Sequence, residues 1–352
     1  MAGVLEPPRY PTPLRECTAL ARPNARLWLK HDGLTHPLYG GNKVRKLDAL
    51  LLEARRNNAR RILTFGAAGS HHVLTTALFA AAQGLGTGAI LVPQRATPHV
   101  VDTLRAAIAE GVEVYPASGY AGVPYAFARA RRRGDYVVPP GASNPIGTLG
   151  YVQAMLELAV QLRAGEIPEP DVIVVPVGSG GTAAGLLAGL LLAGLNSRVL
   201  GVAVMNGPFA RRHVVSLARR TFTLACSLGI GEPGSEMKAL ARDAPRLRAL
   251  FGERFVLDER YIGPGYGEPT PEAERALAVA ERELGLELDL TYTAKAFARA
   301  LDALAVPAAV GVSGTPANLL YWHTLSSAPL APLLERAPAL AALPPSVRAL
   351  LV

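Results

Sequence analysis

The most informative run of this sequence is Leu38-Tyr39-Gly40-Gly41-Asn42-Lys43-Val44-Arg45-Lys46-Leu47. Its two glycines allow a sharp turn and a close approach of the backbone to a ligand, and Asn42 is a good helix N-cap. Apolar residues then recur at helical spacing, which predicts a helix from Asn42 to about Asn57. Lys43 and Lys46 share one face of its first turn, where the helix dipole disfavours cations. A solvated basic turn would explain a lone Lys-x-x-Lys, but the preceding Gly-Gly-Asn favours a negative or electrophilic ligand between the lysines.

A second glycine-rich run follows an apolar segment, residues 171–177, which predicts a strand buried on both faces. The residues after that strand are Gly178, Ser179, Gly180, Gly181 and Thr182, and a helix to about Leu195 comes next. Such a loop at a helix N-terminus exposes backbone N–H groups toward a phosphate. A dinucleotide fingerprint fits less well, because its third glycine falls late, at Gly185, and the next strand ends at Asn206 without an acidic residue for the ribose.

In this order and spacing, the two runs resemble motifs of the 1-aminocyclopropane-1-carboxylate (ACC) deaminase and D-cysteine desulfhydrase family. Its members are fold-type II pyridoxal-phosphate (PLP) enzymes, related to tryptophan synthase β. The resemblance implies that Lys43 forms a Schiff base with PLP, that Lys46 helps to hold the phosphate and that Asn42 lies against the cofactor. It also identifies the glycine loop as the phosphate cup, in which Ser179 and Thr182 add hydroxyl donors.

A third segment, Phe65 to His72, lies at a strand-to-helix turn, where α/β sheets present ligand groups. By the resemblance, Ser70 matches a serine beside the substrate α-carbon, a candidate acid–base or carboxylate-binding group. His71 replaces the asparagine that hydrogen-bonds the PLP 3′ oxygen, and its imidazole titrates near neutral pH. The resemblance places Tyr266 and Tyr292 near the substrate, although for each taken alone a tyrosine packed at a helix start is an equally good interpretation.

The match is imperfect at Val310 to Pro316, which resembles the family's Thr-Gly-Gly-Thr-Pro run. The hydroxyl of that run faces the pyridine nitrogen, and here either Ser313 or Thr315 takes the role. A neutral hydroxyl there leaves the nitrogen unprotonated, which favours elimination over transamination. The candidates are Lys43, Ser70, Tyr266 and Tyr292 for catalysis, and Asn42, Lys43, Lys46, His71, Gly178, Ser179, Gly180, Gly181, Thr182 and Ser313 for cofactor binding.

One position separates the activities within this family. ACC deaminases carry a glutamate directly after the tyrosine that matches Tyr292, and here that position is Thr293. We therefore expect a PLP-dependent lyase that acts on a small amino acid, such as D-cysteine, by β-elimination and releases a keto acid and ammonia. The alternatives are an ACC deaminase, an amino-acid racemase and a PLP-binding member whose catalysis is altered.

Strands and helices alternate through residues 51–150, which implies a parallel sheet and an α/β fold. We expect this block to be a small α/β domain inserted into a large PLP-binding domain made of residues 1–50 and 151–352, with the cofactor in the cleft between them. A short strand is expected at 308–310. The Ala/Leu/Pro-rich tail beyond Trp322 is expected to pack against the large domain.

Composition limits the remaining function classes. Of 352 residues, 50% are hydrophobic and 18% are charged, as in a globular protein with a large core. The net charge of +8 comes mostly from arginines scattered along helices with few aromatics, so we expect no nucleic-acid partner. We find no apolar run long enough for a bilayer and no signal peptide, and Cys17 and Cys226 make no disulfide framework or metal pattern. A cytoplasmic homodimer without metal is expected.

Overall fold

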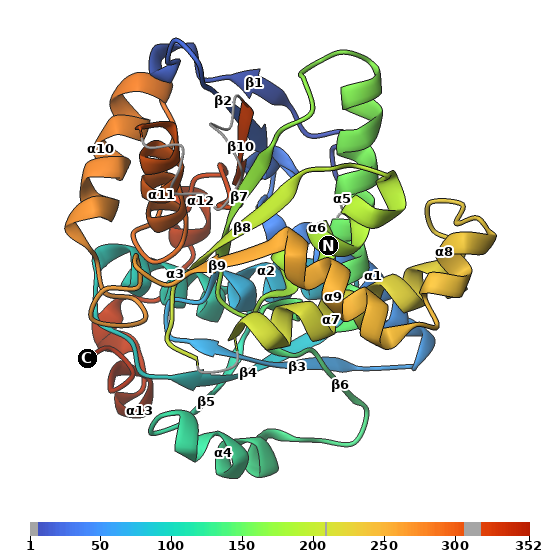
Figure 1. Cartoon of the computed structure of the whole chain (residues 1–352). Coiled ribbons are helices and arrows are strands. Elements are labelled where there is room, and N and C mark those ends of the chain that lie inside the picture. The colour runs from blue at the N-terminus through green and yellow to red at the C-terminus, as the bar shows by residue number, and fades with distance from the viewer. Residues whose placement is uncertain (1–5, 208–209, 306–317) are drawn as a thin grey trace.

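The computed structural model describes residues 6–207, 210–305 and 318–352, which form two parallel-stranded layers flanked by helices (Figure 1). The larger sheet has the strand order β1-β2-β10-β7-β8-β9, in which β1 is antiparallel to β2 and all other neighbours are parallel. Its strands are β1 (Leu14–Glu16), β2 (Arg26–His31), β7 (Val172–Val177), β8 (Arg198–Ala203), β9 (Phe255–Asp258) and β10 (Asn318–His323). The expected α/β fold with two parallel sheets is confirmed.

Strand β7 shows why helices cover both faces of this sheet. Alternate side chains of a strand point to opposite faces, and every residue of β7 is buried. Ile173 and Val175 belong to one core cluster and Val172 and Val174 to another. The helices in the first cluster are α5 (Pro145–Arg163), α6 (Gly181–Ala193), α7 (Ala210–Ser227) and α9 (Ala244–Arg254), with α8 (Ser235–Leu240) packed beside them; α10 (Pro271–Leu284) and α11 (Thr293–Ala305) are in the second.

The smaller sheet has the order β5-β4-β3-β6, and all of its neighbours are parallel. Its elements are β3 (Arg61–Ala67), β4 (Gly86–Val92), β5 (Glu113–Pro116), β6 (Asp135–Val137), α1 (Asn42–Arg56), α2 (His71–Ala82), α3 (Pro98–Ala109) and α4 (Val123–Ala130). Helices α1, α2 and α3 share the core on one face, and α4 covers the other. The strand–helix units expected within 51–150 are present, while the domain boundaries drawn around them stay a prediction, since α1 joins the smaller sheet's core through residues before 51.

The C-terminal tail packs differently from the expectation. Its short helices α12 (Ala331–Leu334) and α13 (Pro345–Arg348) contribute Leu333 and Val347 to the core of the smaller sheet, not of the larger one. The backbone amide of Gln94 donates to the carbonyl of Leu350 at 2.9 Å, which ties the tail to the loop after β4. The reason is that α3 presents apolar residues outward, and the apolar positions of the tail cover them.

Three further expectations concern a predicted strand, membrane-crossing helices and metal binding. The strand expected at 308–310 lies outside the described residues; the strand seen near this end of the chain is β10, which inserts between β2 and β7. Among the described residues, none of the helices has both the length and the apolar character to cross a membrane. Within the same residues, no cluster of three or more His, Cys, Asp or Glu side chains could hold a metal ion.

Candidate active site

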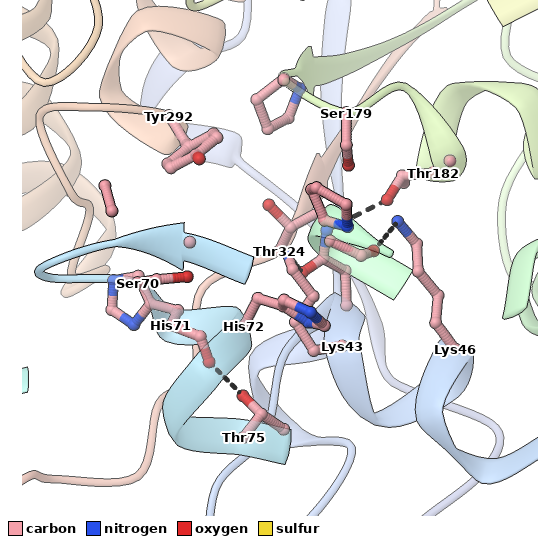
Figure 2. A pocket seen from close by; sticks show the side chains of 18 of the residues that line it. Lys43, Lys46, Ser70, His71, His72, Thr75, Ser179, Thr182, Tyr292 and Thr324 are labelled. Atoms are coloured by element: carbon pink, nitrogen blue, oxygen red, sulfur yellow. Dashed lines mark hydrogen bonds between the residues drawn. The ribbon is translucent and has the colours of Figure 1, made fainter. Parts of the chain in front are cut away.

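A cavity of about 380 Å³ collects the predicted residues at the carboxyl ends of strands from both sheets. The N-termini of α1, α2 and α6 line it, and this edge is where open α/β sheets bind ligands. Figure 2 shows Ser70 and His71 on one side of the cavity, Lys46 and Thr182 on the other, and Lys43 between them. The lining residues from the predicted set are Asn42, Lys43, Lys46, Ser70, His71, Gly178, Ser179, Gly180, Gly181, Thr182, Tyr266 and Tyr292.

Helix α1 presents Lys43 to the cavity. Its N-cap is Gly41, not Asn42 as we expected, because φ is +90° there and a Cβ would lie 2.6 Å from the carbonyl oxygen of Thr324. Asn42 is thereby free to donate to Thr182 Oγ1 at 3.0 Å and to accept from Lys43 Nζ at 2.7 Å. Burial lowers the pKa of Lys43 to about 8, against the opposing charge of Asp289. A neutral, nucleophilic amine is therefore accessible near physiological pH.

Lys46 carries a buried side-chain amine at the cavity. Its side chain is 1% exposed, and its Nζ donates to the carbonyl oxygen of Gly141 at 3.2 Å. No carboxylate of the described residues forms an ion pair with it. Burial, and then repulsion by Lys43, hold the pKa of Lys46 well below its ordinary value. An anion bound beside it would restore the charged form, because a buried charge is stable only when it is paired.

The loop before α6 forms a narrow cradle next to Lys46. Gly180 is left-handed at φ +83°, and the amide of Gly181 donates to Ser143 Oγ at 3.2 Å. A Cβ on Gly181 would lie 2.4 Å from that oxygen and 2.9 Å from Lys46 Nζ, so a larger residue would require these side chains to shift. Ser179 Oγ lies 2.7 Å from Ser143 Oγ. Hydroxyls, first-turn amides and a cation thus converge on one end of the cavity, a donor set suited to a phosphate.

The opposite wall comes from the turn into α2. Ser70 is the N-cap of α2, and its Oγ accepts from the amide of Val73 at 3.4 Å. The two ring nitrogens of His71 lie 2.5 Å from Tyr39 Oη and 2.9 Å from His99 Nε2. A bond from His71 to the cofactor 3′ oxygen stays a prediction, and it requires His71 to release one of these partners.

His72 was not among the predicted site residues, yet it lines the cavity. Its Nε2 lies 2.8 Å from Thr64 Oγ1, which donates its own hydrogen to the carbonyl of Val138 at 2.9 Å. The Nε2 must therefore carry the proton, and burial with the charges of Lys43 and Lys46 lowers the pKa of the ring. His72 Nδ1 is then a buried acceptor that lacks a partner in the described structure.

Two tyrosines close the cavity near α11. Tyr266 and Tyr292 share a hydrogen bond at 2.7 Å between their hydroxyls, and burial raises the pKa of Tyr266 to about 12. Both hydroxyl groups therefore stay protonated at neutral pH and can act as hydrogen-bond donors. Asp289 caps the start of α11 by accepting from the amide of Tyr292 at 2.6 Å and from Thr293 Oγ1 at 2.7 Å. Thr293 is thus occupied by a structural contact.

The lysine helix is held by a buried polar network that the sequence analysis missed. The Arg45 guanidinium and Asp32 carboxylate form two hydrogen bonds at 2.9 and 3.0 Å, and Tyr151 and Trp322 also donate to Asp32 at 2.6 and 2.8 Å. Burial alone would raise the pKa of Asp32, but Arg45, Lys30 and Tyr151 outweigh it and keep that pKa below its usual range. The network joins α1, α5 and β10, all of which contribute to the site.

The last wall is the loop after β10, which contributes Thr324, Leu325 and Ser326. The amide of Asn42 donates to the carbonyl of Thr324 at 3.1 Å, so this loop touches the start of α1. Ser313 and Thr315, the predicted hydroxyl candidates, lie outside the described residues. The signal that could have identified Thr324 is its place at the carboxyl end of an apolar strand, where α/β folds carry ligand groups.

The comparisons with known proteins agree with this geometry. The sequence profile of the family described as "Pyridoxal-phosphate dependent enzyme" matches residues 5–312. The nocardicin C-9′ epimerase of Nocardia uniformis subsp. tsuyamanensis is 32% identical, and the match covers 90% of each chain. The D-cysteine desulfhydrase of Yersinia pestis (strain Pestoides F) is 33% identical, over 83% of this chain and 86% of that protein. A crystal structure described as an ACC deaminase homologue superposes with a TM-score of 0.69 at 27% identity, covering 94% and 95% of the two chains.

The residues around the cavity fit pyridoxal phosphate. An uncompensated buried lysine beside a glycine-containing cradle suits the phosphate, and Lys43, with its lowered pKa, suits the aldehyde. The buried Nδ1 of His72 offers an acceptor between these two ends. Geometry and sequence comparison agree, and this chain belongs to the family of fold-type II pyridoxal-phosphate dependent enzymes.

Proposed function

We propose that the chain is a lyase that removes the β substituent of a small amino acid and releases a keto acid and ammonia, in the manner of a D-cysteine desulfhydrase. The observation that carries the proposal is Thr293, which stands where the family's ACC deaminases have a glutamate. Its hydroxyl donates to Asp289 and caps α11, so it offers no carboxylate to a substrate. The similarity to D-cysteine desulfhydrases over most of the chain supports the same activity.

Pyridoxal phosphate supplies the electron sink that stabilises negative charge at the substrate α-carbon. The side chains of this protein bind the substrate, orient it and move its protons. Lys43, whose pKa is lowered to about 8, would hold the cofactor and is suited to take the α proton of the substrate. Ser70, at one side of the cavity, is our candidate to bind the substrate carboxylate or to act as a second acid–base group.

The remaining cavity groups favour elimination over competing reactions. Ser313 or Thr315 stays our candidate for the neutral hydroxyl near the pyridine nitrogen, and Thr324 adds another hydroxyl residue to the cavity lining, next to the start of α1. A neutral partner leaves that nitrogen unprotonated, which limits delocalisation of the negative charge. Tyr266 and Tyr292 remain protonated, because burial raises the pKa of both. Either hydroxyl can then donate to the departing β substituent.

The test is a substrate panel of D- and L-cysteine, D- and L-serine, cysteate and ACC, with keto-acid release as the readout. We expect release from a β-substituted amino acid to exceed release from ACC, and the reverse order contradicts the proposal. Ser70→Ala should leave the visible absorbance of the bound cofactor intact and slow keto-acid formation by about 10²-fold, as for a lost acid–base group. Retention of full activity would assign Ser70 to capping α2 alone.

A second candidate is an epimerase or racemase, since the similarity to nocardicin C-9′ epimerase covers 90% of the chain. Inversion at the α-carbon needs acid–base groups on both faces, and Lys43 in the middle of the cavity and Ser70 at one side are our candidates for the two groups (Figure 2). Deuterium from solvent that enters the α position without release of a keto acid identifies this activity.

We also propose that the enzyme is a cytoplasmic homodimer. The absence of a membrane-crossing helix in the described residues is compatible with this proposal. Size-exclusion chromatography with light scattering tests the oligomeric state, and a mass of 37.0 kDa in solution would identify a monomer instead.

A further inference from the structure

Three side chains form a continuous hydrogen-bonded chain beside the active-site cavity. Tyr39 Oη lies 2.5 Å from His71 Nδ1, and His71 Nε2 lies 2.9 Å from His99 Nε2. The rings of Tyr39 and His71 stack at a centroid distance of 6.2 Å, and those of His71 and His99 lie 4.8 Å apart. Tyr39 is buried at 2% exposure, whereas His99, on α3, is exposed. The chain therefore runs from the interior to solvent.

This chain also connects two cavities. Tyr39 and His71 line the active-site cavity together with Lys43. His71 and His99 line a second cavity of about 330 Å³, formed mainly by the loop before α3 and the segment before α11. His71, Tyr266, Asp289 and Tyr292 belong to both linings, so they form the shared wall. Within that wall, His71 has one ring nitrogen directed to Tyr39 and the other to His99, and a relay through both nitrogens excludes the predicted bond from His71 to the cofactor 3′ oxygen.

The protonation of His71 allows this chain to work in two directions. Burial, and then the charge of His99, lower the pKa of His71 to about 3, while Lys43 acts in the same sense and Asp289 opposes them. The ring is therefore neutral and carries one hydrogen, on either Nδ1 or Nε2. In one arrangement Tyr39 donates to Nδ1 and Nε2–H donates to His99. In the other, His99 donates to Nε2 and Nδ1–H donates to Tyr39.

We propose that Tyr39, His71 and His99 form a proton relay between the active-site cavity and solvent. A proton from the cavity binds to Tyr39 Oη as the tyrosine gives its own proton to His71 Nδ1. His71 Nε2–H passes its proton to His99, and His99 releases its Nδ1 proton to water. The reverse sequence takes one proton from water and delivers one to the cavity. The number of protons is conserved in each direction, and the two arrangements of His71 are the start and end states.

The relay suits the proposed function, on which its catalytic use rests. Each β-elimination removes one proton from the α-carbon and returns one to the leaving group or to the β-carbon. An asparagine at position 71, as the family resemblance leads one to expect, could bond to both neighbours but could not exchange a donor for an acceptor at low cost, because its amide NH₂ and carbonyl are chemically distinct. Histidine makes the exchange possible.

The test replaces the exposed end of the relay. His99→Gln keeps a polar side chain but cannot accept and release a proton. Arg95→Gln is the matched control on the loop before α3, exposed and with its side chain paired to Glu268. We expect His99→Gln to lower turnover by about tenfold or more and added imidazole to restore it with increasing concentration, while Arg95→Gln is unchanged. Turnover that is unaffected by His99→Gln, or a loss that imidazole does not restore, overturns the relay.

A second measurement does not depend on activity. In holoenzyme labelled with ¹⁵N at histidine, the His71 signals are assigned by their loss in His71→Asn. We expect His99→Gln to shift the His71 Nε2 signal and Tyr39→Phe to shift Nδ1, with Arg95→Gln without effect. If the His71 signals shift in neither His99→Gln nor Tyr39→Phe, the hydrogen-bonded chain itself is contradicted. If the shifts occur but no amino acid yields a keto acid, the proposed elimination is wrong and the relay stands.

Discussion

Replacement of Lys46 by methionine should have opposite effects on cofactor binding and on the stability of the cofactor-free protein. The side chain is buried, and its Nζ contacts the carbonyl of Gly141 in a cavity that also contains Lys43. Methionine keeps a flexible, unbranched stem and removes the amine, together with its charge and its hydrogen bond to Gly141. A hydrogen bond to a charged group contributes about 1.5–3 kcal/mol. At about 1.4 kcal/mol per decade, the loss corresponds to cofactor binding weaker by about 10- to 150-fold.

The effect on the cofactor-free protein follows from the pKa of Lys46. Burial holds it well below 10.5 in the folded state, so between that lowered pKa and 10.5 the unfolded chain binds more protons than the folded one. Lys46 therefore destabilises the fold at neutral pH, and this cost declines as the pH rises toward 10.5. Lys46→Met should raise the free energy of unfolding of the cofactor-free protein at pH 7, and the gain should shrink as the pH increases.

The assay combines titration of the cofactor-free protein with PLP, followed by tryptophan fluorescence, and urea unfolding at several pH values. Lys238→Met is the matched control, since Lys238 is an exposed lysine on α8 and not among the residues that line the cavity. It should change neither quantity. Unchanged PLP affinity in Lys46→Met, or a cofactor-free variant less stable than the wild type at pH 7, would refute the assignment of Lys46 as an anion-binding lysine.

Three further predictions test the geometry of the site. Borohydride should fix the cofactor to the peptide that contains Lys43, and labelling of another peptide would contradict the assignment of Lys43. The rate at which cofactor-free protein binds PLP again should rise with pH through about 8, because the amine of Lys43 must lose its proton. Asp32→Ala should lower the free energy of unfolding by about 3 kcal/mol in urea titrations, because it breaks a buried ion pair with Arg45. A loss below about 1 kcal/mol would mean that Glu157 alone is enough to neutralise Arg45. Gly181→Ala should weaken PLP binding by about 1–3 kcal/mol, since its Cβ would lie 2.4 Å from Ser143 Oγ; wild-type affinity in that variant would show that the cradle can widen.

The parts of the site that could be predicted are those encoded by consecutive residues. Lys43 and Lys46 follow two glycines at a helix start, and the Gly178–Thr182 loop lies between a fully apolar strand and a helix, so both signals are local. The structure adds the steric reason: Gly41 approaches the carbonyl of Thr324, and Gly181 approaches Ser143. Neither neighbour can be inferred from the glycine itself.

The parts that could not be predicted depend on strand order. Strand β10 comes from the C-terminal part of the chain but inserts between β2 and β7, which brings Thr324 next to the start of α1. A sequence pattern has no information on which strands become neighbours, so it could not identify Thr324 as a residue that lines the cavity. His99 was missed because its position beside His71 depends on the packing of α3 against α2.

Asp32 accounts for how these distant segments keep a common geometry. Its two carboxylate oxygens accept from Arg45 on α1, Tyr151 on α5 and Trp322 on β10. Trp322 lies two residues before Thr324, and Arg45 lies between Lys43 and Lys46. One buried charge therefore sets the position of helix α1 relative to the loop after β10. A carboxylate is effective here because it accepts several charge-assisted bonds at once, and these are shorter and stronger than neutral ones. The geometry of the site thus depends on a residue that does not line the cavity.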